Sequence, residues 1–592
     1  MGWCKGSLIK QARQFQSALL LASLALSPFA AAQLLDVQLN GLEGESRDNA
    51  LAWLGVSPET SQARANYLYS AQRKVEKSLQ ALGYYRARVE LELTRSKEPW
   101  SLVISVQPGE PVLLRQVNVR LLGDAVNDPA FAELLETSPL QGGDVLNHGV
   151  YDRFRRSLTS LARRRGYFEG AFSQARVEVE PVGGVADVSL LYDSGKRFNF
   201  GAISYDQDII HESLLSPLLL IEQGEPFDQK KLRDTQIQLQ RTGYFSTVIL
   251  RPIVDMVDDG QVPLELNLFP AKQHSFDLGA GFSTDTRERL SFTWRTPKLN
   301  AYGHQQETRI QYSDVNPSGR FTYSIPVSHP LDDAVQFTAR LEDNEFGDLD
   351  SRQRELGIRR EMRKSDWIYS YSLRGLDEAW NSEGIDRQND YLLPGISLSQ
   401  RLHGGSLVNP ASGFSHWYRA EAGGANVGSD IDLVRLTANF GLIHSLGEKH
   451  RFVLRSNLGA AFVEDADRGQ LAPSLNFFAG GAQSIRGYGY QSIGNEVTVE
   501  NATGNPVSLI VGGDRLLTGS AEYQYSFTQN WRGAVFVDAG DAFDEGDFEG
   551  NVGAGFGVHY VTQVGAIRLN IANPVTDDDP SWRIHLAIGA EF

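Results

Sequence analysis

Arg486 is the first candidate site residue of this 592-residue chain, because a buried arginine side chain requires negatively charged partners. It lies in the stretch Ile485-Arg486-Gly487-Tyr488, within a long connection between regions of alternating polarity. A guanidinium keeps its proton and offers a planar fork, so an enclosed arginine needs carboxylate partners. Gly487 permits a tight turn that would present Arg486 at a loop tip. Downstream, Glu522 and Asp538 fall on the polar side of alternating stretches, so both are candidates to face inward.

Covalent chemistry is not expected. The chain contains no Gly-x-Ser-x-Gly elbow and no His-Glu-x-x-His motif, and its eleven histidines are scattered rather than set at ligand spacing. Gly553, Gly555 and Gly557 read as one face of a strand, not as a phosphate-binding loop. We therefore expect a protein that is not an enzyme, with no catalytic residue, no metal and no cofactor.

The second half of the chain alternates in polarity from about Ser275 to Phe592. Apolar residues on one face and polar or small ones on the other are typical of a transmembrane β-barrel. A soluble antiparallel sheet alternates too, but this region is too long for one sandwich. At about 20 residues per strand and connection, residues 271–592 predict about sixteen antiparallel strands. Aromatic residues near the strand ends are expected to form interfacial girdles: Trp294, Trp367, Tyr369, Tyr371, Trp417 and Trp531.

The first half contains a unit repeated three times. Each copy has a helical pattern, a Gly-Tyr-aromatic tripeptide that ends the helix, and then alternating stretches that predict strands. The tripeptides are Gly83-Tyr84-Tyr85, Gly166-Tyr167-Phe168 and Gly243-Tyr244-Phe245. This pattern predicts three small α+β domains, at residues 33–109, 110–194 and 195–270.

The N-terminal residues have the features of a secretory signal. Lys5, Lys10 and Arg13 precede a short apolar core, and small residues end it, so residues 1–32 are expected to be removed together with Cys4. The remaining 53 basic and 73 acidic residues give a formal charge of −20, which argues against nucleic acid as a partner. No later apolar run approaches the ~20 residues of a spanning helix, so a membrane would be crossed by a closed sheet.

The repeats resemble POTRA domains, and the Ile-Arg-Gly-Tyr stretch resembles the signature of the BamA/TamA superfamily of outer-membrane assembly and secretion barrels. Gly512-Gly513 with Glu522, and the stretch 536–540, match further superfamily patterns. Three repeats resemble the TamA branch most closely. The resemblance implies that Arg486 tips a loop folded into the lumen and is held by Asp538 and, secondarily, Glu522. It also implies an outer-membrane barrel with periplasmic POTRA domains, client outer-membrane polypeptides, a TamB-like periplasm-spanning partner, and a role in moving phospholipid.

A lateral seam between the first strand, near 276–282, and the last, near 582–592, is our mechanistic hypothesis. Glycines would weaken the pairing there, and an opened seam would expose a strand edge that templates a client strand. Glycine also simply fits crowded inward positions. The residues assigned to the seam are Phe276, Leu278, Gly279, Gly281, Gly589 and Phe592.

Other functions stay open at this point. A BamA-like general assembly factor and a two-partner secretion pore belong to the same superfamily, and a passive porin would share the barrel. Conductance that survives deletion of residues 33–270 without a client defect would favour a porin. A dedicated exoprotein encoded beside the gene would favour a secretion pore.

Overall fold

The computed structural model describes residues 34–256, 259–382, 385–406, 409–500, 506–562, 565–577 and 580–589. The predicted signal peptide, 1–32, lies outside the described residues. The chain forms two compact units, one mainly from residues up to Ala202 and the other mainly from Leu264 onward. None of the helices in the described part of the chain has the length and apolar character needed to span a bilayer.

The first repeat is a three-stranded sheet, in the order β1-β3-β2, with two helices. Val75 and Leu79 of α3 are fully buried against it, as the helical spacing of apolar residues requires. The opening strand β1 was not predicted from the sequence. Its elements are β1 (Leu35–Asn40), α2 (Gly44–Leu54), α3 (Ser61–Gln80), β2 (Arg88–Thr94) and β3 (Trp100–Gln107).

The second and third repeats have the same order of strands, β4-β6-β5 and β7-β9-β8. The second consists of β4 (Leu113–Leu122), α4 (Pro129–Glu136), α5 (His148–Arg164), β5 (Ala171–Glu180) and β6 (Val185–Asp193). The third consists of β7 (Asn199–Ser204), α6 (Glu212–Leu215), α7 (Gln229–Arg241), β8 (Phe245–Pro252) and β9 (Gln261–Pro270). The prediction of three α+β domains is therefore confirmed.

The tripeptide glycines end their helices through a positive φ, which is +92° at Gly83, +89° at Gly166 and +73° at Gly243. The tyrosines that follow Gly166 and Gly243 are buried. The hydroxyl of Tyr244 donates to the carbonyl oxygen of Gly303, in a turn of the barrel, at 2.9 Å. In the third repeat the glycine of the motif thus ends the helix, and the tyrosine of the motif makes a contact with a residue distant in the sequence.

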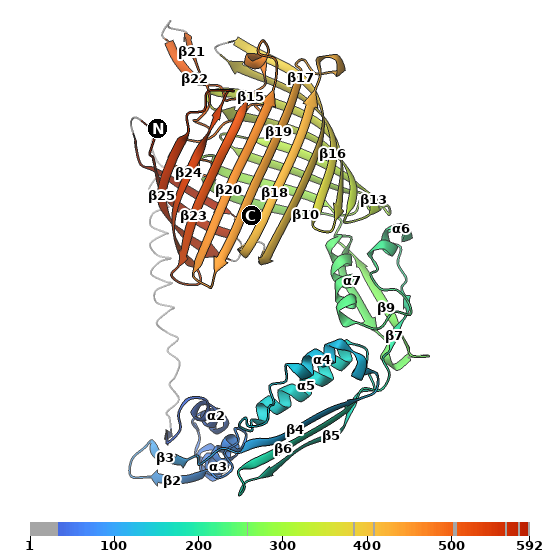
Figure 1. Ribbon diagram of the computed structural model, residues 1–592, viewed down its shortest axis with the longest axis vertical. Coiled ribbons are helices and arrows are strands. Elements are labelled where there is room, and N and C mark those ends of the chain that lie inside the picture. Colours follow the sequence, from blue (N-terminus) through green and yellow to red (C-terminus); the bar gives the residue numbers. More distant parts are fainter. Residues whose placement is uncertain are drawn as a thin grey trace, which may run out of the picture. The chain divides into compact units, whose positions relative to one another are not determined.

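The second half closes into an antiparallel barrel of sixteen strands within the described residues, as predicted (Figure 1). The strands β10 to β16 are Ser275–Ser283, Arg287–Thr296, Gln305–Ser313, Ser318–His329, Asp333–Phe346, Leu349–Lys364 and Trp367–Ser382. The strands β17 to β20 are Ile385–Gly405, Pro410–Gly423, Leu433–Leu446 and His450–Phe462. The strands β23 to β27 are Arg515–Ser526, Trp531–Phe543, Asn551–Thr562, Gly565–Pro574 and Arg583–Gly589.

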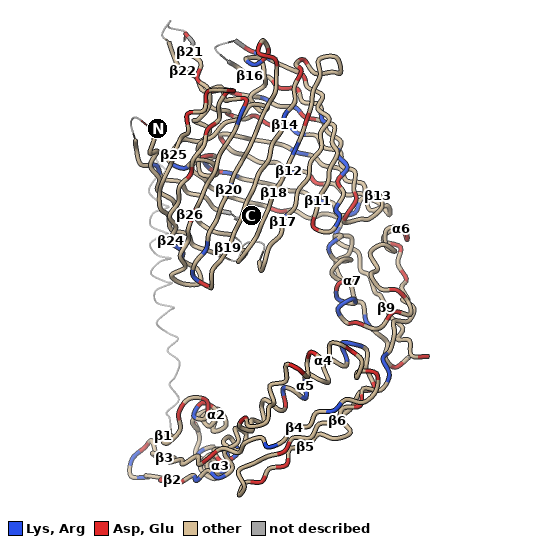
Figure 2. Tube along the Cα trace, in the orientation of Figure 1, with Lys and Arg blue, Asp and Glu red and all other residues tan. Residues whose placement is uncertain are grey.

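The barrel wall is apolar outside and polar inside. Val535 and Val537 of β24 are about half exposed on the outer face, whereas Asp538, on the inner face, is completely buried. Figure 2 marks the charged residues along the chain. An outer belt of exposed apolar side chains is unusual for a soluble protein and suits a bilayer.

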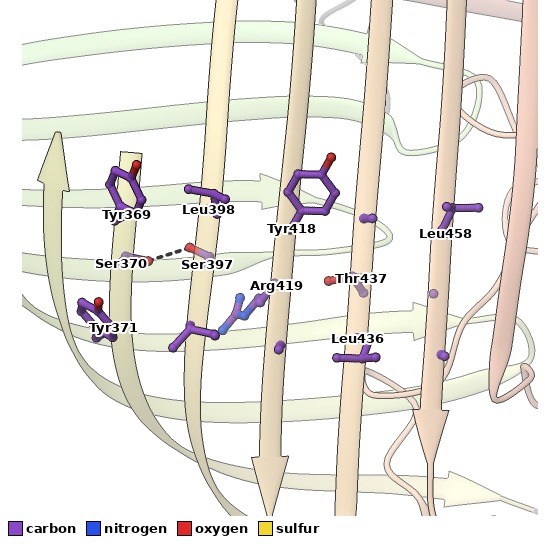
Figure 3. A pocket seen from close by; sticks show the side chains of 15 residues that line it. Tyr369, Ser370, Tyr371, Ser397, Leu398, Tyr418, Arg419, Leu436, Thr437 and Leu458 are labelled. Carbon is purple, nitrogen blue, oxygen red and sulfur yellow. Dashed lines mark hydrogen bonds between the residues drawn. The ribbon is translucent and has the colours of Figure 1, made fainter. Parts of the chain in front are cut away.

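Small residues leave an apolar hollow in the outer wall between β16 and β20 (Figure 3). Tyr369, Leu398 and Tyr418 line it, and the intervening Ser370 and Ser397 hydrogen-bond to each other at 2.6 Å. The predicted girdle is wrong for Trp417, because Trp417 shares the face of Glu421, whose carboxylate is buried among inward arginines.

Candidate functional site

The connection between β20 and β23, residues 463–514, is the returning loop. It includes a hairpin of β21 (Glu496–Glu500) and β22 (Pro506–Ile510). The rest of the loop carries apolar side chains that pack against the inner wall of the barrel. One buried apolar cluster contains Leu471, Leu475, Phe477 and Ile485 of the loop together with Trp380, Tyr391 and Leu393 of the wall. The loop and the inner wall therefore share one apolar core inside the barrel.

Arg486 sits at the tip of the returning loop and is 2% exposed. Its Nε donates to Asp538 Oδ2 at 2.7 Å, its Nη2 to Asp538 Oδ1 at 2.8 Å, and its Nη1 to Glu522 Oε2 at 2.5 Å. The backbone N–H of Arg486 also donates to Asp538 Oδ2, at 3.0 Å. The structure brings together the three residues paired by resemblance, here called the clasp. Asp538 makes three of these contacts and Glu522 makes one.

The guanidinium of Arg486 is further held by groups that the sequence analysis did not assign. Its carbon lies 3.3 Å from the ring centroid of Phe536, which stacks beneath it. Its Nη2 donates to Ser520 Oγ at 3.2 Å. Phe536 lies two residues before Asp538 on β24, and Ser520 lies two residues before Glu522 on β23. Residues two apart in a strand face the same side, so this spacing could have predicted that both side chains point inward.

Glycines make room for the loop tip. Gly487 has φ +102°, and a Cβ there would lie 2.8 Å from the backbone carbon of Asn573. A Cβ at Gly553 of β25 would lie 1.8 Å from the carbonyl oxygen of Arg486. The alternating glycines of β25 are a strand face, as read from the sequence, and part of that face lets the loop approach the wall.

The loop tip also contacts both strands that meet at the seam. The N–H of Gly487 donates to Nε2 of His585, on β27, at 2.9 Å. The N–H of Ala482 donates to Oδ2 of Asp285, in the turn after β10, at 2.8 Å. Because Nε2 accepts, a neutral His585 carries its proton on Nδ1, which faces Asp285 Oδ1 at 3.8 Å. The loop thus bridges the two sides, through residues that the sequence did not single out. The remaining tip residue, Tyr488, contacts Thr576 through its hydroxyl, at 2.9 Å.

Pairing across the seam is minimal. β10 pairs with β11 along its whole length and β27 pairs with β26, but the described residues show one register pair between β10 and β27, Ser283 with Ala587. The N–H of Thr284 adds a hydrogen bond to Leu586 O at 3.2 Å. These residues differ from those assigned to the seam. Phe276, Leu278, Gly279 and Gly281 pair with β11, Gly589 pairs with Ala566, and Phe592 lies outside the described residues.

A second anchor of the returning loop was also missed. Glu378, fully buried on the inner face of β16, accepts from Ser351 Oγ at 2.7 Å and from the N–H of Ser474 at 3.1 Å. The hydroxyl of Ser474 donates to the same carboxylate. An acidic residue in an alternating strand gives no sign of which loop it will meet, so only the inward face of Glu378 could have been predicted.

The comparisons with known proteins agree with this architecture. The family model described as the Omp85 superfamily domain matches residues 272–592. The chain belongs to the Omp85 superfamily. A model described as POTRA domain TamA domain 1 matches residues 36–108, and one described as a surface antigen variable number repeat matches residues 198–270.

Individual relatives of this Omp85 protein are distant. The outer membrane protein assembly factor BamA of Nitratidesulfovibrio vulgaris is 20% identical, over 94% of this chain and 83% of its own length. The crystal structure of BamA from Haemophilus ducreyi lacking POTRA domains 1–3 has a TM-score of 0.64 at 14% identity, covering 81% of this chain and 99% of that one. That likeness establishes the shared fold. CdiB from Acinetobacter baumannii gives a TM-score of 0.45 at 13% identity, covering 81% of this chain and 89% of its own.

Within this Omp85 barrel, the clasp, the glycine face and the seam contacts converge on one region of the wall, from β23 through β27 to β10. None of these groups forms a nucleophile–base pair, since Asp538 and Glu522 are both committed to Arg486. What the arrangement can do is hold a loop in place and link that loop to a weakly paired strand junction.

Proposed function

We propose that this protein inserts or secretes autotransporters and other outer-membrane polypeptides, acting in the outer membrane of a Gram-negative bacterium with its POTRA domains in the periplasm. The client strand pairs with the edge that opens between β10 and β27. The proposal assigns the protein no covalent chemistry, so the purified chain should lack protease and esterase activity. It also includes a TamB-like partner and a role in moving phospholipid.

The observation that carries this proposal is the poorly paired junction of β10 and β27. A closed barrel gains from pairing every edge, and every other neighbouring pair of strands has an extended register. An edge that, in the described part of β27, is held by one register pair separates at little cost, and main-chain donors and acceptors then become available to an extended segment. The returning loop contacts both sides, so it can stabilise the closed state without strand pairing.

A disulfide across the junction tests the proposal. Ser283 and Ala587 are register partners on the inner face, so a Ser283→Cys/Ala587→Cys variant places two thiols within bonding reach. We expect the oxidised variant to fold and to stop inserting clients, and reduction to restore insertion. The matched control is Asn439→Cys/Asn457→Cys, at an ordinary lumenal pair of β19 and β20. Normal insertion by the oxidised seam variant would overturn the proposal.

The TamA-like role is supported by the TamA-type model on residues 36–108 and by the three repeats among the described residues. A BamA-like general role is the second candidate, favoured by the similarity to the BamA of N. vulgaris along most of the chain. Depletion distinguishes them. A TamA-like protein should lower autotransporters selectively, with a change in outer-membrane phospholipid, whereas a BamA-like protein should lower all barrel proteins together.

A further inference from the structure

The helix α5 of the second repeat carries an unusual concentration of cations for an acidic chain. It contains five arginines and one aspartate, while the full chain has a formal charge of −17. Two rows run along its exposed side, each with an arginine, a hydroxyl and a second arginine at spacings of four residues. The rows are Arg155-Thr159-Arg163 and Arg156-Ser160-Arg164, and together they line a groove, here called the arginine groove (Figure 2 marks its basic residues).

Few partners within the chain neutralise this groove. Arg155 lies 3.5 Å from Asp152, and Nε of Arg156 donates to the backbone oxygen of Asp152 at 3.2 Å. In the part of the chain that the structure describes, no carboxylate lies within 4.0 Å of the Arg163 or Arg164 guanidinium, and no acidic residue lines the groove.

The helix dipole explains only part of this pattern. Cations in a last turn are stabilised by the carbonyl end of a helix, which accounts for Arg163 and Arg164. Arg155 and Arg156 lie two turns earlier, where that effect has vanished. Their alignment with the last-turn pair points to a ligand with more than one negative group.

We propose that the arginine groove binds an extended acidic segment of a partner polypeptide. Arginines eight residues apart on a helix are about 12 Å apart. In an extended chain, residues i and i+4 point to the same side and lie about 13 Å apart. Two glutamates separated by three residues therefore match each row, and the guanidinium forks suit carboxylates.

A polypeptide fits the groove better than a lipid surface. Phe172 of β5 and Gln229 of α7 line the groove together with the arginines, so an apolar side chain and an amide flank the cations. Side chains on one side of an extended segment match the spacing of each row, whereas a planar array of headgroups presents no such fixed spacing. Phe172 adds an apolar surface against which a partner's methylenes pack.

The test measures binding of a fluorescein-labelled peptide to the full-length protein in detergent micelles. The peptide has Ser and Gly around two Glu residues at i and i+4, and its control has Gln in place of Glu. We expect Arg163→Gln/Arg164→Gln to weaken binding at least about tenfold. The matched control, Arg73→Gln/Lys77→Gln, removes two charges from exposed positions of α3 and should change binding less than about twofold.

Three results would overturn the proposal. Equal effects of the two double variants would show only a response to net charge. Equal binding of the Gln peptide would remove the role of carboxylates. Sedimentation with phosphatidylglycerol vesicles that depends on Arg163 and Arg164, without peptide binding, would assign the groove to a membrane surface. Thermal unfolding of each variant establishes that it is folded. None of the four substituted residues belongs to the barrel strands that form the seam, so the disulfide test of the seam is independent.

Discussion

At the scale of single residues, the clasp places a permanent charge where water is excluded. Arg486, Asp538 and Glu522 are all nearly inaccessible, and each ion relies on the others for its solvation. Such a group is not strong evidence for net stability, because desolvation offsets the attraction. It does make the loop position specific, because any displacement of Arg486 leaves two buried carboxylates without the hydrogen bonds that its guanidinium donates.

The two carboxylates should differ in their effect on unfolding. Asp538→Ala is expected to destabilise the protein by about 3–5 kcal/mol, because it leaves Arg486 with most of its donors unsatisfied. Glu522→Ala should cost less, since Glu522 makes one contact with Arg486. Adding Arg486→Met to Asp538→Ala should recover part of the loss by removing the stranded charge. Urea unfolding in micelles measures all three, and a larger loss for Glu522→Ala than for Asp538→Ala would contradict the geometry.

The glycine face of β25 gives a second residue-scale prediction. Gly553→Ala places a methyl group against the carbonyl oxygen of Arg486, so the loop tip should withdraw from the wall. We expect faster cleavage of the returning loop by added protease. The control is Gly519→Ala, since an added Cβ there meets nothing within 4 Å. Equal cleavage rates in both variants would mean that the tip tolerates the methyl group.

The sequence predicted the residues of the clasp but not the residues around it that contact the loop tip. The alternation around Asp538 and Glu522 predicted inward carboxylates, and the resemblance supplied their partner. Asp285 and His585 carried no comparable signal, because they are joined through backbone donors of Ala482 and Gly487 that any sequence could provide. Contacts between a backbone and a side chain distant in the sequence cannot be read from spacing.

At the scale of elements, the returning loop and the seam are parts of one arrangement. Asp285→Ala should remove the contact between the loop and the turn after β10. Among the residues that the structure describes, little more than one register pair would then join β10 to β27. The rate of disulfide formation between cysteines at Ser283 and Ala587 should then fall, because the two strands spend less time in register. Asp277→Ala is the control, as Asp277 is a carboxylate of β10 paired with Arg295. An unchanged rate in Asp285→Ala would separate the loop from the seam.

Alternation also explains which element predictions succeeded. A period of two identifies a strand and its faces, so the number of strands and the barrel followed from the sequence. The alternation of polarity does not show which residues of two strands are paired, and a strand that pairs over only part of its length keeps the same alternation. The glycines at 279 and 281 were therefore assigned to the seam by position, although the register pair found in the described part of the seam lies at the end of β10.

At the scale of the whole molecule, the joint between the second and third repeats contains a further group of charges. Arg165, just after α5, donates to Asp128 Oδ1 at 3.0 Å and to Asp228 Oδ2 at 3.2 Å, and so links α4 of one repeat to the start of α7 in the next. The Tyr167 hydroxyl donates to Asp128 at 3.2 Å, and burial, with the adjacent carboxylate, raises the pKa of Tyr167 to about 12. Burial would raise the pKa of Asp128, but hydrogen bonds from Arg165 and the Ala130 N–H outweigh it and hold that pKa below its usual range.

This joint should loosen in acid. A carboxylate whose folded pKa is depressed contributes stability above its unfolded pKa, about 3.9, and that contribution disappears as the pH falls through the lower folded value. Since the chain has one cysteine, in the predicted signal, spin labels on cysteines at Gln174 and Asp255 would report the joint alone. The interspin distance distribution should be narrow at pH 7 and broaden below about pH 3.9. Asp128→Asn should broaden it at pH 7, whereas Asp187→Asn, which removes a carboxylate paired with Arg115 within the second repeat, should not. If both variants matched the unsubstituted protein at pH 7, the Asp128 carboxylate would not hold the joint. Apolar contacts would hold it instead, among them the contact of Phe168 with Phe227, whose ring centroids are 4.9 Å apart.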